Sequence, residues 1–213
     1  LNFSSFNTSQ VTNMSRMFDS CYILSNINVS NFNTSNVTDM KLMFSGAGVT
    51  NLDLSSFDTR NVTNMAAMFE GCRNLINLNL STFNTSKVTD MSFMFNFCAS
   101  ISELDISTFD TGNVKNMSTM FQRCENLRKI NFDINKFNTG QVTDMSYMFS
   151  RCFKLKDIDV SKFNTSQVTD MSWMFFLCEA LIELDLSTFD TSNVTNMEGM
   201  IADCTNLKSL DIS

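Results

Sequence analysis

The chain has 213 residues, of which 43% are hydrophobic and 17% are charged, and its formal net charge at pH 7 is −7. The hydrophobic fraction is large enough to fill a core and excludes a disordered tail. The acidic balance argues against nucleic acid as a partner, because phosphate contacts need a basic stripe and the Lys and Arg residues form none.

One repeat of about 26 residues fills the chain, and a Phe opens each copy. The eight copies begin at Phe6, Phe32, Phe57, Phe83, Phe109, Phe137, Phe163 and Phe189. A fixed period of this length is typical of a solenoid, in which each repeat contacts only its neighbours. We therefore expect residues 1–213 to form a single solenoid without an internal boundary. Both ends fall in mid-repeat, which predicts an excised part of a longer chain.

The first half of each repeat has the spacing of a short helix. In the fourth copy, Val88, Met91, Met94, Phe95 and Cys98 follow one helical face. The residue before the first Met is Asn or Asp in every copy, which favours a helix N-cap, and the preceding Thr is a competing cap. Another Thr, two residues after the opening Phe, is expected to bond to backbone groups within its own turn.

The second half of each repeat resembles a strand of a leucine-rich repeat. In "LINLNLS", residues 75–81, we expect Leu78 and Leu80 to point inward and Asn77 and Asn79 to point outward. Parallel stacking at about 4.8 Å per repeat predicts a body roughly 40 Å long. The predicted fold is an α/β repeat solenoid, a right-handed leucine-rich-repeat-like stack with a parallel sheet on one face and short helices on the other.

The full unit, "MFxxCxxLxxLDLSxFDTSNVTxM", resembles the repeat of BspA-type bacterial leucine-rich repeat surface proteins, in the variant common in mycoplasma-type surface lipoproteins. The resemblance covers the whole chain. It implies an extracellular protein at a bacterial cell surface that serves adhesion or interaction and has no enzymatic activity. The chain carries Phe where leucine-rich repeats have a buried Asn ladder, so a flatter stack than the familiar horseshoe is expected.

Seven Cys residues occupy one column of the repeat, and Ala47 stands where the eighth would be. They are Cys21, Cys72, Cys98, Cys124, Cys152, Cys178 and Cys204. An Ala in this column favours small buried hydrophobes, so a buried, reduced ladder is expected, with disulfides as the weaker alternative. The chain has no His and no CxxC pair, so neither a metal site nor a cofactor is predicted.

The outward positions of the predicted strands form one candidate contact surface. Its residues are Glu103, Asp105, Lys129, Asp157, Asp159, Glu183 and Asp185. The simplest interpretation is a solvated acidic face. A calcium site, or a docking patch for a basic partner, are the alternatives.

A second candidate surface comes from the position two residues after the first Met, where the repeat does not dictate the side chain. Phe93, Tyr147 and Trp173 occupy it in three copies, whereas others have Arg, Thr or Gly. Phe176 and Leu177 follow Trp173 closely. We expect these five residues to form an exposed contact surface for a protein, although local packing onto neighbouring helices is an alternative.

Catalysis finds no support in the sequence, because a Ser or Cys nucleophile needs a positioned base and His is absent. The predicted function is a non-enzymatic adhesion or interaction module. Its expected partner is a host or neighbouring-cell surface protein or an extracellular-matrix component. Membrane contact is expected only through an anchor outside this chain, and exposed apolar end repeats favour end-to-end self-association. The alternative is a structural spacer that binds nothing itself.

Overall fold

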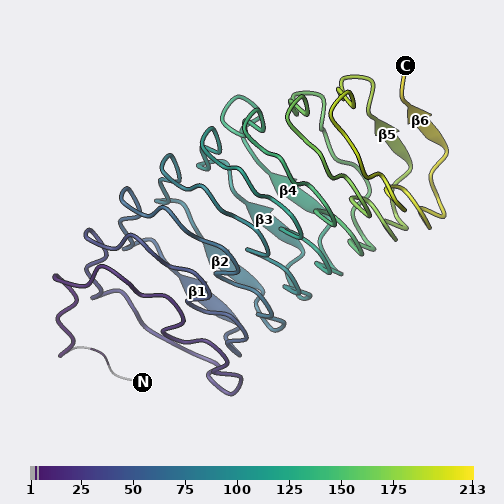
Figure 1. Cartoon of the computed structure of the whole chain (residues 1–213). Helices are drawn as coiled ribbons and strands as arrows, with labels where there is room; N and C mark the ends of the chain where they lie inside the picture. Colours follow the sequence, from purple (N-terminus) through teal and green to yellow (C-terminus); the bar gives the residue numbers. More distant parts are fainter. Residues whose placement is uncertain (1–2, 4) are drawn as a thin grey trace.

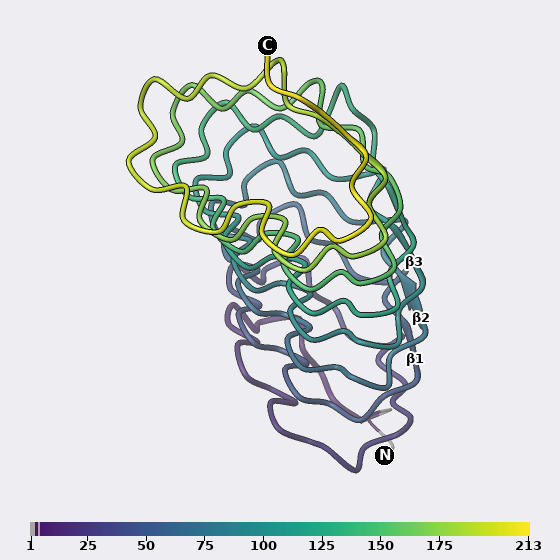
Figure 2. The same cartoon turned by 90° about the vertical axis from the view of Figure 1, so that its right-hand side faces the viewer.

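The repeats stack as successive rungs of an elongated body. The computed structural model describes residue 3 and residues 5–213. In Figure 1 the chain winds from one end of the stack to the other, so the first and the last repeat lie at opposite ends. Figure 2 shows each repeat as one loop laid on the loop before it.

Short parallel strands line one side of the stack (Figures 1 and 2). They are β1 (Asn51–Asp53), β2 (Asn77–Asn79), β3 (Glu103–Asp105), β4 (Lys129–Asn131), β5 (Glu183–Asp185) and β6 (Ser209–Asp211). The pairs β1–β2, β3–β4 and β5–β6 are parallel, with Leu52 opposite Leu78 in the first. Asn77 and Asn79 are exposed, Leu78 is partly buried and Leu80 is buried, which confirms the predicted orientation.

The prediction of short helices is wrong, because the described residues form turns in their place. Among the described residues, no helix is long and apolar enough to cross a membrane. Phe93 and Phe97 have φ angles of 59° and 60°, in the left-handed region that a right-handed helix excludes. Every second amide of this segment donates to a carbonyl of the next rung instead of to a carbonyl within its own rung. The amide of Phe93 donates to the carbonyl of Ser118 in the next rung (3.0 Å), whereas that of Asn96 donates to the carbonyl of Phe93 (3.0 Å).

The helical spacing nevertheless identified the buried side chains. Val88, Met91, Met94, Phe95 and Cys98 are all fully buried. Two left-handed residues, four positions apart, recur in every repeat. They coil the segment as a series of tight turns, which keeps the Met and Phe side chains inward at spacings that a helix would also give.

A column of Phe rings runs through the core. Its members are Phe18, Phe44, Phe69, Phe95, Phe121, Phe149 and Phe175. Neighbouring rings are stacked, with centroids 5.4 to 5.9 Å apart. Each ring between the two ends of the column thus has a copy on both faces, and the column continues as Ile201 in the last repeat.

The Asn or Asp before the first Met opens a turn and does not cap a helix. Asp90 accepts a hydrogen bond on Oδ1 from the amide of Ser92 (2.9 Å), and the same bond forms in all eight repeats. This Asx-turn bond satisfies one amide that the turns leave free. The column also links the rungs, because each member forms a parallel bridge to the next, as Asp90 does to Asn116.

The Thr column bonds between rungs, where the sequence predicted bonds within one turn. The hydroxyl of Thr85, which is fully buried, donates to the carbonyl of Asp110 and accepts from the amide of the same residue, both at 2.8 Å. A hydroxyl donates in this way from each of the first seven repeats. The buried Thr ladder therefore joins each rung to the next through side-chain to backbone hydrogen bonds.

Replacing Thr85 with Val tests this ladder. Thr85→Val keeps the shape of the side chain but leaves the amide and carbonyl of Asp110 without their partner. We expect the free energy of unfolding to fall by about 1–3 kcal/mol for each buried group left unsatisfied. Chemical denaturation measures the loss.

The matched control is Thr89→Val. Thr89 is exposed and its hydroxyl makes one long bond, 3.3 Å, to the carbonyl of Thr63. Water can replace that bond, so we expect a change well under about 1 kcal/mol. Equal losses in the two variants would contradict a special role for the buried hydroxyls.

Candidate functional site

The Cys column belongs to the scaffold. All seven are free thiols, and Cys72, Cys98, Cys124, Cys152 and Cys178 are buried, as predicted. Each Sγ from the third repeat onward donates to the carbonyl of a Phe one rung back, as Cys98 does to Phe69 (3.2 Å). Burial raises the pKa of Cys72 and of Cys124 to about 12. These thiols therefore stay protonated at neutral pH and are poor nucleophiles.

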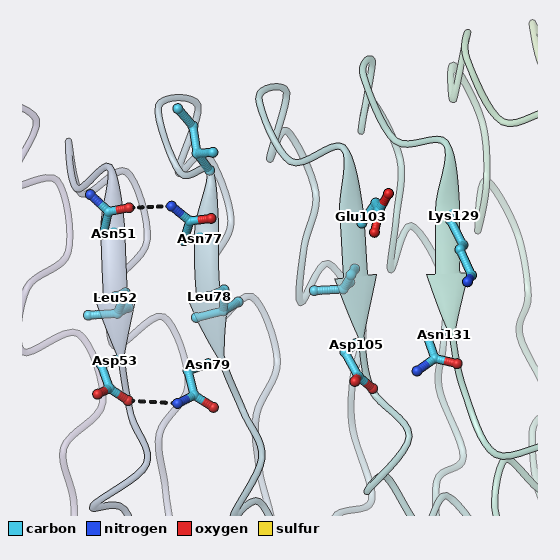
Figure 3. Close-up of a pocket in the computed structure, with 12 residues that line it drawn as sticks. Asn51, Leu52, Asp53, Asn77, Leu78, Asn79, Glu103, Asp105, Lys129 and Asn131 are labelled. Carbon is cyan, nitrogen blue, oxygen red and sulfur yellow. Dashed lines mark hydrogen bonds between the residues drawn. The ribbon is translucent and has the colours of Figure 1, made fainter.

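Polar side chains cover the strand face, which holds a shallow hollow of about 540 Å³ around β1–β4 (Figure 3). Amides bond between neighbouring strands. Nδ2 of Asn77 donates to Oδ1 of Asn51 (2.6 Å), and Nδ2 of Asn79 donates to Oδ1 of Asp53 (3.0 Å). An Asn thus stands beside an Asp where two carboxylates would repel each other.

The predicted acidic contact residues lie on this strand face but in separate groups. Glu103 and Asp105 belong to β3, and Lys129 of β4 stands opposite Glu103. Glu183 and Asp185 belong to β5. Asp157 and Asp159 are exposed in the sixth repeat, which has no assigned strand. Over residues 3 and 5–213, no three His, Cys, Asp or Glu side chains lie close enough together to hold a metal ion.

Three of these carboxylates, those of Asp105, Asp159 and Asp185, already serve the scaffold as acceptors of a turn amide. The amide and hydroxyl of Ser107 hydrogen-bond to Asp105 and hold the pKa of its carboxyl below the ordinary value. Ser161 lowers the pKa of Asp159 in the same way, through its hydroxyl and amide. These side chains are acceptors in Asx turns that end the strand segments.

The lowered pKa of Asp105 predicts an acid-dependent loss of stability. Because the folded pKa lies below the unfolded value of about 3.9, the carboxylate stabilises the fold above about pH 4, and this contribution is lost as the pH falls through the folded pKa. In Asp105→Asn the side chain still accepts the Ser107 amide but no longer titrates. We expect a thermal midpoint close to wild type at pH 7 and a smaller decrease between pH 5 and pH 2.5.

Glu103→Gln is the control for this prediction. It removes the same charge two residues away, on the same strand, but leaves the Asx acceptor in place. We expect its decrease in thermal midpoint at low pH to remain as large as that of wild type. If both variants flatten the profile equally, net charge and not the Asx bond governs the acid response.

The turn side of the stack holds the predicted aromatic residues. The rings of Tyr147 and Trp173 stack across neighbouring rungs with centroids 6.3 Å apart, and Phe176 meets Trp173 edge to face at 4.8 Å. Tyr147 and Trp173 are partly buried and lie outside the core, in agreement with the prediction that they are not core residues. They pack on each other, since the helices expected to receive them are absent.

The structure does not gather all five predicted aromatic and apolar residues. Phe93 is 40% exposed and sits in the same column, but Thr119 on the intervening rung separates it from Tyr147. Leu177 occupies the second left-handed column beside this group and is partly buried.

Arginine residues extend the group, and the sequence analysis missed them. The guanidinium of Arg151 lies over Phe176 at 5.5 Å, and those of Arg73 and Arg123 lie 4.7 and 4.3 Å from the ring centroid of Phe97. Arg123, Arg151 and Phe97 share the position just before the Cys column. That position varies between copies as much as the one that was noticed, so the same argument could have found it. We name Phe97, Arg123, Tyr147, Arg151, Trp173 and Phe176 the arginine–aromatic strip.

Comparison with known sequences places the chain in a family. Three overlapping segments, residues 1–103, 50–132 and 125–213, match the family described as "Mycoplasma protein of unknown function, DUF285". The chain belongs to this family. No curated protein matches this DUF285 chain.

Three solved bacterial structures are similar to the DUF285 chain. A leucine rich cell surface protein from Faecalibacterium prausnitzii has 19% identity and a TM-score of 0.48, over 94% of this chain and 57% of that one. A leucine-rich repeat protein from Bacteroides ovatus has 13% identity and a TM-score of 0.44, over 95% and 67%. One from Eubacterium ventriosum has 18% identity and a TM-score of 0.40, over 83% and 52%. The chain thus spans little more than half the length of the first of them.

A substitution at Gly199 tests the packing position of the Trp173 indole in this DUF285 chain. A Cβ on Gly199 would overlap the six-membered ring of the Trp173 indole. Gly199→Ala should therefore displace the indole toward water and shift the fluorescence emission of the chain's one Trp to longer wavelength.

Gly71→Ala is the matched control for this experiment. Gly71 has φ of 70°, close to the 58° of Gly199, but its Cβ would find its nearest neighbour at 3.5 Å. Both variants carry the left-handed penalty of about 1–2 kcal/mol, and only Gly199→Ala should move the emission. An unchanged spectrum in Gly199→Ala would contradict the stacked arrangement.

Proposed function

We propose that this chain is a non-enzymatic binding module at a bacterial cell surface. Its partner is a protein of a host or neighbouring cell surface, or of the extracellular matrix. The observation that carries the proposal is the arginine–aromatic strip on the turn side. The resemblance of the repeat to BspA-type surface proteins supports the location.

The strip lies where the scaffold leaves the side chain open. Its members occupy three positions of the repeat, and other copies have Ser, Gly or Ala at the equivalent places, such as Ser20, Gly199 and Ala202. Stacking of the rungs therefore does not require these large side chains. Trp, Tyr and Arg are also the residue types that most often dominate the energy of protein interfaces.

The charges of the strip favour a partner with carboxylates beside an apolar anchor. Among the residues that the structure describes, Arg123 and Arg151 form no ion pair, although the chain is acidic overall. Both guanidinium groups lie against rings, which orders them in advance and reduces the entropy lost on binding. The strip thus offers ordered donors for carboxylates beside the rings of Trp173 and Phe176.

The strand face and the spacer hypothesis are weaker explanations. Asp105, Asp159 and Asp185 on the strand face each accept an amide of their own turn, so the scaffold already uses them. A spacer that binds nothing would not need a cluster of large side chains on four consecutive rungs. The absence of His and the high pKa of the buried thiols favour a role without covalent chemistry.

A capture experiment with four proteins tests the proposal. The immobilised wild-type chain is exposed to host-cell surface and extracellular-matrix extract beside Tyr147→Ser/Trp173→Ser, Phe93→Ser, and a variant that neutralises Asp157, Asp159, Glu183 and Asp185. We expect the double variant to lose the captured protein, with at least a tenfold weaker Kd in a titration of the purified partner. Phe93→Ser is the matched control, since it removes an exposed ring of the same column outside the strip.

Each outcome separates the hypotheses. Loss only in the variant without carboxylates would move the contact to the strand face. If no variant changes capture, or if wild type captures nothing while all four proteins melt alike, the spacer hypothesis is the better one.

A further inference from the structure

A second hollow, of about 660 Å³, opens on the turn side of the first four repeats. It lies apart from the strip residues of the sixth and seventh repeats. Its volume is within the range of about 300–1,000 Å³ typical of small-molecule sites.

The hollow exists because two consecutive rungs lack a side chain. Gly46 and Gly71 occupy the left-handed column in which later rungs carry Phe97, Arg123 and Arg151. Because the second and third rungs have no side chain at this position, a gap remains between the side chains of the first and the fourth rung. The repeat does not require this gap, because the same backbone conformation accepts large residues elsewhere.

Tyr22 forms one wall of the hollow. Its ring lies against Gly46, where a Cβ would come within 2.9 Å of Cε1, and the side chain remains 70% exposed. Its hydroxyl is 3.1 Å from Oγ of Ser20. The glycine thus lets an aromatic ring lie along the hollow with much of its surface open to a ligand.

Arg73, Phe97 and the hydrogen-bonded pair of Asn96 and Glu70 form the opposite wall. Phe97 holds the Arg73 guanidinium, 4.7 Å from the ring centroid. Nδ2 of Asn96 donates to Oε1 of Glu70 (3.2 Å). Asn96 is only 5% exposed, and its Oδ1 is a buried acceptor with no hydrogen-bond partner in the described part of the chain. An unsatisfied buried polar atom beside a hollow is a reason to expect a bound group there.

The lining restricts the chemistry of the ligand. Glu70 and Arg73 are the charged residues among those that line the hollow, so their charges cancel and neither a polyanion nor a cation is favoured. The other polar groups are amides and hydroxyls, next to an aromatic face. A ligand that matches them has an apolar C–H face and several hydroxyls, which is the chemistry of a pyranose sugar.

We propose that this hollow binds a neutral saccharide. A sugar ring lies on the face of Tyr22, one hydroxyl donates to Oδ1 of Asn96, and the others bond to Glu70, Arg73 and Asn74. The proposal does not rest on the proposed function: the hollow shares Phe97 with the strip, but its other lining residues lie outside the strip and its ligand belongs to a different class.

Filling the hollow is the direct test. Gly71→Leu places in the gap a residue that the same column already carries as Leu177, at φ of 57°, so the backbone accepts it. Gly71→Ala has the same backbone conformation but adds only one methyl group. Tyr22→Ala removes the aromatic platform, and Tyr22→Phe keeps it. Thermal melting confirms that each variant is folded.

The probes are immobilised neutral oligosaccharides of hexoses and N-acetylhexosamines, with sulfated and sialylated sugars beside them. The best neutral probe is then titrated by calorimetry. We expect Gly71→Leu and Tyr22→Ala to weaken binding at least tenfold, while Gly71→Ala and Tyr22→Phe stay within about threefold of wild type. Tyr147→Ser/Trp173→Ser should bind the sugar as wild type does, which separates this site from the strip.

Three results would overturn the proposal. The first is that no neutral saccharide binds the wild-type chain at millimolar concentration. The second is binding restricted to the sulfated or sialylated probes. The third is a neutral ligand whose affinity is unchanged in both Gly71→Leu and Tyr22→Ala.

Discussion

The hydrogen bonds between one rung and the next are the constraint on which the whole structure depends. In each of the first seven repeats, four amides of the turn segment donate to carbonyls of the following rung, as the amide of Phe93 does to Ser118. A rung by itself would leave these groups without partners, so it can fold only against its neighbour. The stacked Phe column and the Thr ladder act in the same direction, and all three require the same residue at the same place in each copy.

This constraint also determines where function can reside. Inward Met and Phe, the Asx acceptors and the Thr hydroxyls are each committed to stacking, so they cannot vary without loss of stability. At the two left-handed positions, stacking uses the backbone amides, which donate to the next rung whatever the side chain is. The identity of the side chain can therefore vary at these positions, and the chain carries both large side chains and glycines there. Large residues such as Trp173 and Arg151 build the strip, whereas Gly46 and Gly71 leave a hollow.

On the strand face, exposed polar side chains stabilise the fold. Its exposed column looks like a charged contact surface in the sequence. Asp53, Asp105 and Asp159 nevertheless accept the amide two residues later, and Asn79 donates to Asp53 across the rungs. The charge of these Asp residues thus follows from the need for an acceptor at each turn.

The sequence by itself determined the period, the buried columns and the direction of the strand residues, because these depend only on which positions are apolar in every copy. It did not determine the backbone of the Met–Phe segment: spacings of three and four residues suit a helix and a chain of turns equally, and only pairing with the next rung selects the turns. Residues from different rungs also form the contact of Arg151 with Phe176 and the two walls of the hollow, Tyr22 and Phe97. Such neighbours are decided by the tertiary structure, since stacking sets which copies face each other.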